Sequence, residues 1–204
     1  METKTATNPN QTKGVNKMRK VIVSVHTTLD GFMSGPIGDL DNLDWLYPRV
    51  EELSKDVLDL LKTWDTILLG RVTYEGLAQY WPTATGEFAD QMNTTPKIVF
   101  SKTPMKVEWG KWDNISLIHE NIAEEVKKMK QQPGKDMVIF ASAKLVQSFT
   151  NLGLIDEYKI LVHPVILGSG KRLFEDIEDR HNLKLVNTKT YKGEAVLLDY
   201  QPIK

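Results

Sequence analysis

Some short stretches of this chain are apolar along nearly their whole length instead of alternating with polar residues. The clearest are Val21 to Val25 and Met137 to Phe140. A strand with one face in water alternates. A nearly continuous run rich in valine and isoleucine is typical of a strand buried on both faces. The sequence therefore predicts a central sheet that is covered by other elements on each side.

Between the strands, apolar residues recur at helical spacing, so strands and helices alternate along the chain. Pro48 suits a first helical turn, Pro82 and Gly153 mark helix ends, and Asn121 with Glu124 three residues on is typical of a capped start. The expected strands are Val21–His26, Thr66–Leu69, Lys97–Ser101, Ile115–Ile118, Met137–Phe140 and Tyr158–Val162, and the expected helices run from Pro48 to Trp64, up to about Tyr80, from Asn121 to Gln131 and from Ser142 to Gly153.

The C-terminal part has a different pattern. Two strand-like runs, Leu183–Thr190 and Ala195–Tyr200, are joined through Lys192 to Glu194, which is a hairpin signal and not a helical crossover. The sequence thus predicts an α/β fold: a three-layer sandwich with a mixed, mostly parallel central sheet, helices on both faces and a C-terminal antiparallel hairpin.

Composition limits the function classes. Of the 204 residues, 26 are basic and 27 acidic, giving a net charge of -1, so no overall field attracts nucleic acid or an anionic membrane surface. There is no cysteine, the four histidines are far apart in sequence, and no apolar run approaches the ~20 residues that span a bilayer. We expect a cytoplasmic protein with a small-molecule partner and no metal site. Residues 1–17 are almost wholly polar and predict a disordered leader, followed by one domain over residues 18–204.

Three turns that follow strands carry residues suited to binding phosphate. Helix N-termini and close backbone approach favour anions, and the carboxyl ends of parallel strands are where open α/β sheets bind ligands. The alternative is that these residues only shape turns, cap helices and stay solvated. The candidate residues are Gly70, Arg71 and Thr73, with Thr73 as a helix cap; Ser101 and Lys102; and Ala141, Ser142, Ala143 and Lys144, with Ser142 as a cap.

Asp30 follows the first strand and precedes Gly31. From that position its carboxylate should project into the ligand crevice, where it could accept a hydrogen bond from a ring N–H. It could also donate a proton if the apolar neighbours Leu29 and Phe32 raise its pKa. An Asp-Gly pair is also a common turn signal without chemical content.

Five motifs, in this order and spacing, resemble the reductase domain of bacterial bifunctional riboflavin-biosynthesis proteins and their stand-alone dihydrofolate-reductase-like relatives. The resemblance runs from Met18 to about Pro202. The motifs are Leu29 to Phe32, Leu69 to Glu75, Ser101 to Thr103, Gly153 to Glu157 and Pro164 to Phe174.

The resemblance implies an NADPH-dependent oxidoreductase that reduces a small, flat heterocyclic or carbonyl substrate, pyrimidine-like or pterin-like. In such a protein the Gly70 and Ala141 turns would hold cofactor phosphates, and Ser101 and Lys102 would lie near the adenosine end. The walls around nicotinamide and substrate would be Leu29, Asp30, Gly168, Ser169 and Gly170. A homodimer is also implied.

The chain departs from the family pattern after the strand that ends at Phe140. The family usually carries two glycines there, and this chain has Ala141 and Ser142. If the first position is left-handed, alanine costs about 1–2 kcal/mol. An alternative function is therefore a nucleotide-binding protein that retains the fold without turnover.

Overall fold

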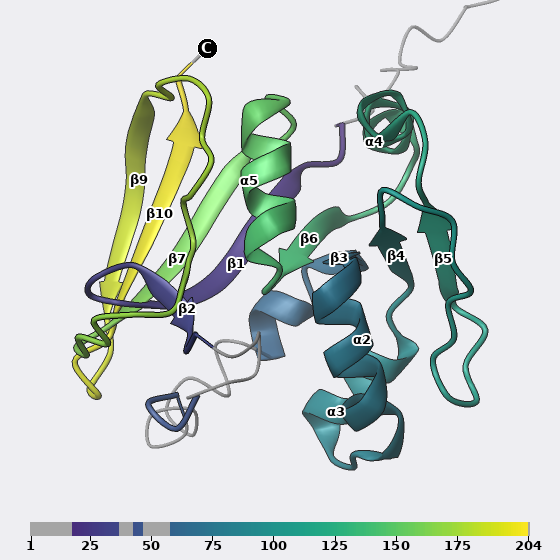
Figure 1. Cartoon of the computed structure of the whole chain (residues 1–204), viewed down its shortest axis with the longest axis horizontal. Helices are drawn as coiled ribbons and strands as arrows, with labels where there is room; N and C mark the ends of the chain where they lie inside the picture. The colour runs from purple at the N-terminus through teal and green to yellow at the C-terminus, as the bar shows by residue number, and fades with distance from the viewer. Residues whose placement is uncertain (1–17, 37–42, 47–57, 204) are drawn as a thin grey trace, which may run out of the picture.

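The structure is a computed structural model that describes residues 18–36, 43–46 and 58–203. These residues form one large sheet, a small two-stranded sheet and helices that follow the strands (Figure 1). The expected leader, residues 1–17, and most of the helix expected from Pro48 lie outside the described residues; residues 58–61 are helical. The elements are β1 (Val21–Thr28), β2 (Phe32–Ser34), β3 (Trp64–Gly70), α2 (Arg71–Tyr80), η1 (Trp81–Thr83), α3 (Glu87–Thr94), β4 (Lys97–Phe100), β5 (Ile115–Ile118), α4 (Ile122–Gln131), β6 (Asp136–Phe140), α5 (Ala143–Asn151), β7 (Glu157–His163), β8 (Lys171–Arg172), β9 (Leu183–Thr190) and β10 (Val196–Pro202).

The large sheet has the strand order β5-β4-β3-β6-β1-β7-β10-β9. The first six strands of this order, from β5 through β4, β3, β6 and β1 to β7, are parallel to one another. The last two strands, β10 and β9, are each antiparallel to the strand before them. The predicted mixed sheet with a C-terminal hairpin is thus confirmed. Because the six parallel strands point the same way, the segments that follow them all emerge at one edge of the sheet, the carboxyl edge.

Each face of the sheet is covered by its own apolar core, as the buried runs predicted. Alternate residues of β1 point to opposite faces: Val21, Val23 and Val25 pack with α4 and α5, whereas Ile22 packs with residues 58–61 and with side chains of α2 and α3. Such double cover explains why β1 and β6 read as nearly continuous apolar segments.

Several local expectations were wrong. Trp64 begins β3 instead of ending a helix, and Thr73 is the third residue of α2 with Gly70 at the N-cap position, so Thr73 is not the cap. Asn121 does precede α4, but it is left-handed (φ 49°) and its side chain makes no cap hydrogen bond. Helix α3 and the β2–β8 ribbon were not predicted.

The β9–β10 hairpin stands at one end of the sheet beyond α5 (Figure 1). Nearly all of β9 is exposed on both faces, including Leu185 at 48% and Val186 at 50%. Strand β9 is also an edge strand. This end of the sheet is therefore the part of the described fold with the least cover.

Lysine 97, the first residue of β4, is buried although it carries a charge. Its Nζ donates to the carbonyl oxygens of Asn93 (3.1 Å) and Thr95 (2.6 Å) and lies 4.6 Å from the centre of the Trp109 ring. Burial lowers the pKa of Lys97 from 10.5 to about 8. The lysine thus caps the end of α3 at the cost of desolvating its ammonium group.

Among residues 18–36, 43–46 and 58–203, no helix is both long and apolar enough to span a bilayer.

Candidate functional site

The predicted phosphate-binding turns lie next to one another at the carboxyl edge. Strands β4, β3 and β6 are neighbours in the sheet, so the segments that follow them are adjacent. The backbone N–H of Gly70 donates to Ser142 Oγ at 2.9 Å. This hydrogen bond joins the N-terminus of α2 directly to the N-terminus of α5. The structure therefore brings together two of the three turns through a shared contact, and the Ser101 turn follows the next strand.

The Ala141–Ser142 turn is strained. Both residues are left-handed, with φ of 55° and 58°, a region that non-glycine residues disfavour. Ser142 is at the N-cap position of α5, but its hydroxyl does not cap that helix as expected and instead accepts from Gly70. Because Ser142 is left-handed and the next residue, Ala143, is right-handed, their successive backbone N–H groups point to the same side, which is the geometry of an anion-binding nest.

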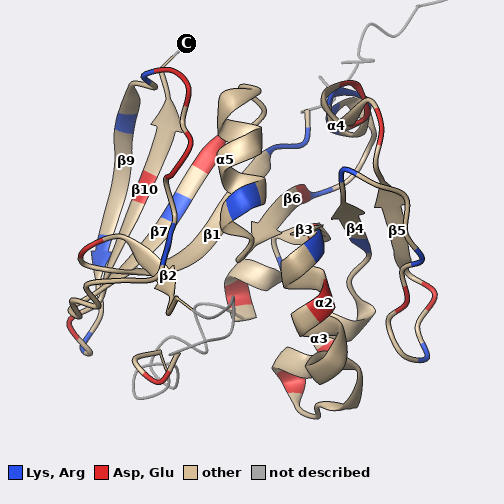
Figure 2. Ribbon diagram, viewed as in Figure 1, with Lys and Arg blue, Asp and Glu red and all other residues tan. Residues whose placement is uncertain are grey.

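The basic side chains of these turns, Arg71, Lys102 and Lys144, differ in whether they pair with an acidic residue. Arg71 donates to Glu75 one turn on (2.8 Å), and Lys144 pairs with Asp176 (2.8 Å), a hydrogen bond that raises the pKa of Lys144. Lys102 is exposed, and the neighbouring Ser101 is buried, with its hydroxyl accepting from the backbone N–H of Thr103. Lys144 thus leans toward the 175–176 segment. In Figure 2, basic and acidic residues are interspersed over the ribbon, so the positive charge at the turns is local.

Asp30 is held by three donors. Its carboxylate accepts from Thr28 Oγ1 (2.6 Å) and from the backbone N–H groups of Leu167 (3.2 Å) and Gly168 (2.8 Å). The Thr28 hydrogen bond is the largest cause that lowers the pKa of Asp30 to about 2. That direction is opposite to the one a proton donor needs, so the structure argues against this role. The carboxylate instead ties the segment after β1 to the segment after β7.

The Gly168–Gly170 loop is fixed against the segment that follows β1. A Cβ on Gly170 would lie 2.1 Å from the carbonyl oxygen of Ser34, and φ at Gly170 is +145°, so only glycine fits. Leu29 and Ile166 flank Asp30 and the loop with exposed side chains, at 66% and 75%. These predicted wall residues therefore form one cluster beside the turns, and Ile166 is an apolar member that the sequence did not single out.

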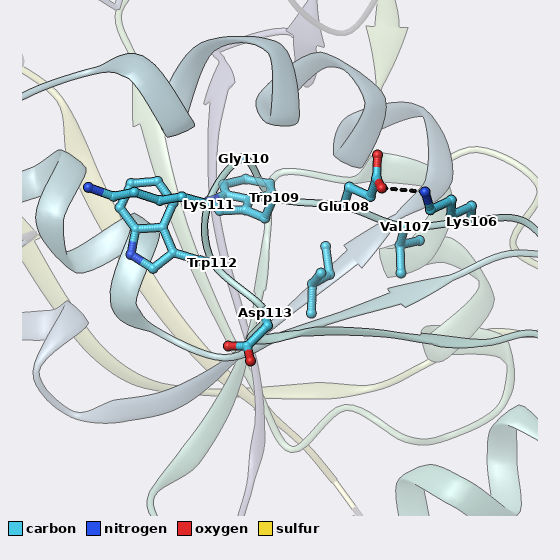
Figure 3. Close-up of a pocket in the computed structure, with 9 residues that line it drawn as sticks. Lys106, Val107, Glu108, Trp109, Gly110, Lys111, Trp112 and Asp113 are labelled. Atoms are coloured by element: carbon cyan, nitrogen blue, oxygen red, sulfur yellow. Dashed lines mark ion pairs between the residues drawn. The ribbon is translucent and has the colours of Figure 1, made fainter.

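A shallow hollow of about 420 Å³ lies elsewhere, along the β4–β5 connection (Figure 3). It is lined by residues 106–113 and Ile115, with Lys111 over the ring of Trp112. Its floor includes Trp109, which is buried and donates to Asn93 Oδ1. None of the predicted site residues lines this hollow, so it is not part of the carboxyl-edge cluster.

Two histidines that the sequence left as ordinary strand residues meet near the same edge. Nδ1 of His26 lies 2.9 Å from Nε2 of His163. Sequence spacing gave no hint of the pair, because β1 and β7 are far apart along the chain. The signal available was that each histidine stands at or near the end of a buried strand.

The eight-stranded, mostly parallel sheet with helices on both faces and a C-terminal hairpin defines the dihydrofolate-reductase-like α/β class. The chain belongs to the RibD C-terminal domain family, whose sequence model matches residues 19–197. The uncharacterized protein YyaP of Bacillus subtilis (strain 168) is 37% identical over 189 residues, covering 90% of this chain and 95% of that protein.

Solved structures share the fold. A putative riboflavin biosynthesis protein from Shewanella sp. PV-4 superposes with a TM-score of 0.76 at 22% identity, covering 91% of this chain and 99% of that one. Dihydrofolate reductase from Enterococcus faecalis, complexed with NADP(H), gives a TM-score of 0.57 at 16% identity, covering 91% and 97%. At these identities the two structures show that the fold is shared.

Proposed function

We propose that this protein is an NADPH-dependent reductase that transfers a hydride to a small, flat heterocyclic or carbonyl substrate, pyrimidine-like or pterin-like. The observation that carries the proposal is the Gly70–Ser142 hydrogen bond, which joins two helix N-termini into one anion-binding edge beside Leu29 and Asp30. The NADP(H) complex of the Enterococcus faecalis reductase, which has the same fold, supports the choice of cofactor.

The donors at this edge fit the phosphates of a dinucleotide. The N–H groups of the Ala141–Lys144 turn and the start of α2 would hold the pyrophosphate, since helix N-termini attract anions. Arg71, Ser101 and Lys102 would serve the 2′-phosphate with a guanidinium, a hydroxyl and an ammonium group. When bound, the nicotinamide supplies the hydride from its C4.

The protein's part on the substrate side is to present a shaped, partly apolar wall. Leu29 and Ile166 are exposed apolar side chains that suit the face of a flat ring. Asp30 holds the backbone of Leu167 and Gly168 and so fixes the loop that would contact the ring. In this arrangement Asp30 orients the site and need not give up a proton.

The test is a titration with NADPH and NADH by fluorescence, for the wild type and Arg71→Ala. We expect NADPH to bind more tightly than NADH, and the Arg71→Ala variant to lose most of that preference, because the guanidinium is removed. Lys62→Ala, which changes an exposed lysine before β3, is the matched control and should leave both affinities unchanged. Equal affinities for the two cofactors in the wild type would refute the NADPH assignment.

A second candidate function is nucleotide binding without turnover, which the left-handed Ala141 and Ser142 favour. Strain at this turn would alter the pose of the pyrophosphate and move the nicotinamide away from substrate. NADPH oxidation with pterins, pyrimidines and quinones separates the two functions. Tight NADPH binding with no oxidation on any of them would support this second candidate.

We further propose that the protein is a homodimer that pairs through the β9–β10 end of the sheet. Leu185 and Val186 leave apolar surface exposed there, and burying it against a second copy would stabilise both. Light scattering at micromolar concentration tests this; Leu185→Lys should shift a dimer toward monomer. A monomeric wild type would refute it.

A further inference from the structure

The His26–His163 pair lies on the sheet face opposite α4 and α5. Thr28 of β1 is in register with His163 of β7, and the valines next to the histidines, Val25 and Val162, pack into the core on the other face. Both imidazoles therefore project from the same face, close to the carboxyl edge. Their rings stack with 5.2 Å between centroids and 23° between planes.

The contact between the two rings fixes the orientation of His26. With Nδ1 of His26 2.9 Å from Nε2 of His163, one nitrogen donates and the other accepts, which couples the tautomer of one ring to that of the other. The edge of Trp45 packs against His163 at 5.0 Å, and His163 is fully buried. The buried ring is thus held from two sides and acts as a support.

His26 keeps an open hydrogen-bonding position. The residue is less buried than His163, and its side-chain hydrogen bond within the described part of the chain is made by Nδ1, which leaves Nε2 to a ligand. Burial, and then the neighbouring His163, lower the pKa of His26 to about 3. The ring is therefore neutral at neutral pH and presents one donor or acceptor without charge.

The open nitrogen lies next to the proposed substrate side of the site. Thr28, two residues after His26 on the same face of β1, donates to Asp30, and Asp30 holds the backbone of Gly168. Both carboxylate oxygens of Asp30 are already occupied by donors. A ligand here can therefore hydrogen-bond to Nε2 of His26, whereas the carboxylate oxygens of Asp30 already accept hydrogen bonds from the protein.

We propose that His26 contacts the substrate through Nε2, hydrogen-bonding an uncharged ring N–H, ring nitrogen or carbonyl at the edge of a flat heterocycle, and that His163 is its positioning residue. The inference rests on the proposed function for the identity of the substrate class. A neutral imidazole favours an uncharged partner, because an anionic group would gain more from a cation. His26 thereby selects which edge of the ring enters.

The substitution His26→Asn separates substrate contact from structural support. Asparagine places its amide where Nδ1 stands and keeps the bond to His163, but it has no group at the position of Nε2. If the pair only supports the fold, His26→Asn should behave as wild type in every assay. If Nε2 contacts substrate, His26→Asn should bind uracil or pterin about five- to tenfold more weakly, the effect of one lost hydrogen bond, with NADPH affinity unchanged.

Nitrogen NMR of histidine-labelled protein supplies a readout that needs no turnover. Addition of uracil or pterin should shift the Nε2 resonance of His26 saturably, with and without NADPH, and leave exposed His181 unmoved. His163→Leu should abolish the saturable shift, and His163→Gln, which places an amide where Nε2 stands, should restore it. His181→Asn is the matched control variant.

The outcomes distinguish this inference from the proposed function. Normal NADPH binding, with His26 unmoved by both probes and His26→Asn unchanged in probe affinity, would overturn the role of His26 alone. Absence of NADPH binding, with the His26 shift still present, would overturn the cofactor assignment and support His26 as a heterocycle-binding residue.

Discussion

Replacing Ala141 with glycine tests whether the turn between β6 and α5 stores strain. At φ 55° an alanine costs about 1–2 kcal/mol relative to glycine. Glycine in turn gives the unfolded chain more freedom, which costs about 0.4–1 kcal/mol of stability. The difference predicts that Ala141→Gly raises the free energy of unfolding by about 0.5–1 kcal/mol.

The same substitution two residues on is the matched control. Ala143 is the first residue of α5 and is right-handed, so glycine there relieves no strain and should lower stability by about 0.5–1 kcal/mol. Ser142→Gly relieves strain at φ 58° but removes the acceptor of the Gly70 N–H, a loss of about 0.5–1.5 kcal/mol, so it should gain less than Ala141→Gly.

Urea unfolding followed by circular dichroism measures all three variants. Shifts in the midpoint at constant slope report changes in stability. If Ala141→Gly lowers stability as much as Ala143→Gly does, the turn is not strained and the reasoning fails.

Three further predictions concern groups that the structure holds in unusual settings. The pKa of Lys97 is about 8 in the folded protein and 10.5 for a free lysine. Between these two pH values the unfolded chain therefore binds more protons than the folded protein. The free energy of unfolding should rise by up to about 3 kcal/mol from pH 8 to 10.5. Lys97→Met should abolish this rise and Lys102→Met should not; equal slopes in all three would contradict it. The pKa of Asp30, lowered from 3.8 to about 2, predicts stability that is lost as the pH falls through that interval, and Asp30→Asn should flatten this part of the profile measured by thermal unfolding. Gly170→Ala should lower the free energy of unfolding by about 3 kcal/mol or more, because its Cβ would clash with the Ser34 carbonyl oxygen. Gly168→Ala, whose Cβ would meet no atom within 4 Å, should lower it only by the backbone strain of about 1–2 kcal/mol. Similar losses in the two variants would show that the contact with Ser34 is not tight.

The sheet and its covering helices could be predicted because strands that are buried on both faces have nearly continuous apolar sequences. Val21 to Val25 and Met137 to Phe140 became β1 and β6, and the hairpin signal at Lys192 to Glu194 became the β9–β10 turn. In contrast, β2 has three residues and β8 has two, which is too short for a strand to show a recognisable alternation of apolar and polar residues in the sequence. Helix α3 begins after Gly86 and has few apolar residues, so its periodicity is weak.

The positions of the candidate site residues could be predicted where backbone geometry and strand order decide them. The turns after β3 and β6 were placed at one edge by the parallel-sheet rule, and the structure links them through Gly70 and Ser142. The partners of individual side chains could not be predicted, since they depend on tertiary neighbours. The three donors around Asp30 come largely from a loop 137 or 138 residues away, and the pair made by His26 joins strands 137 residues apart.

The place of β1 in the sheet has a consequence for how the chain is made. β1 is the first described strand to be synthesised, yet its two neighbours are β6 and β7, and the N–H of Lys20 just before it bonds Asp136, 116 residues later. At ribosomal rates of about 5–20 residues per second, this apolar strand stays unpaired for roughly 6 to 23 seconds. Until β6 emerges, the nascent chain exposes a valine-rich segment, so the newly made protein should depend on holding chaperones more than a chain whose first strands pair locally.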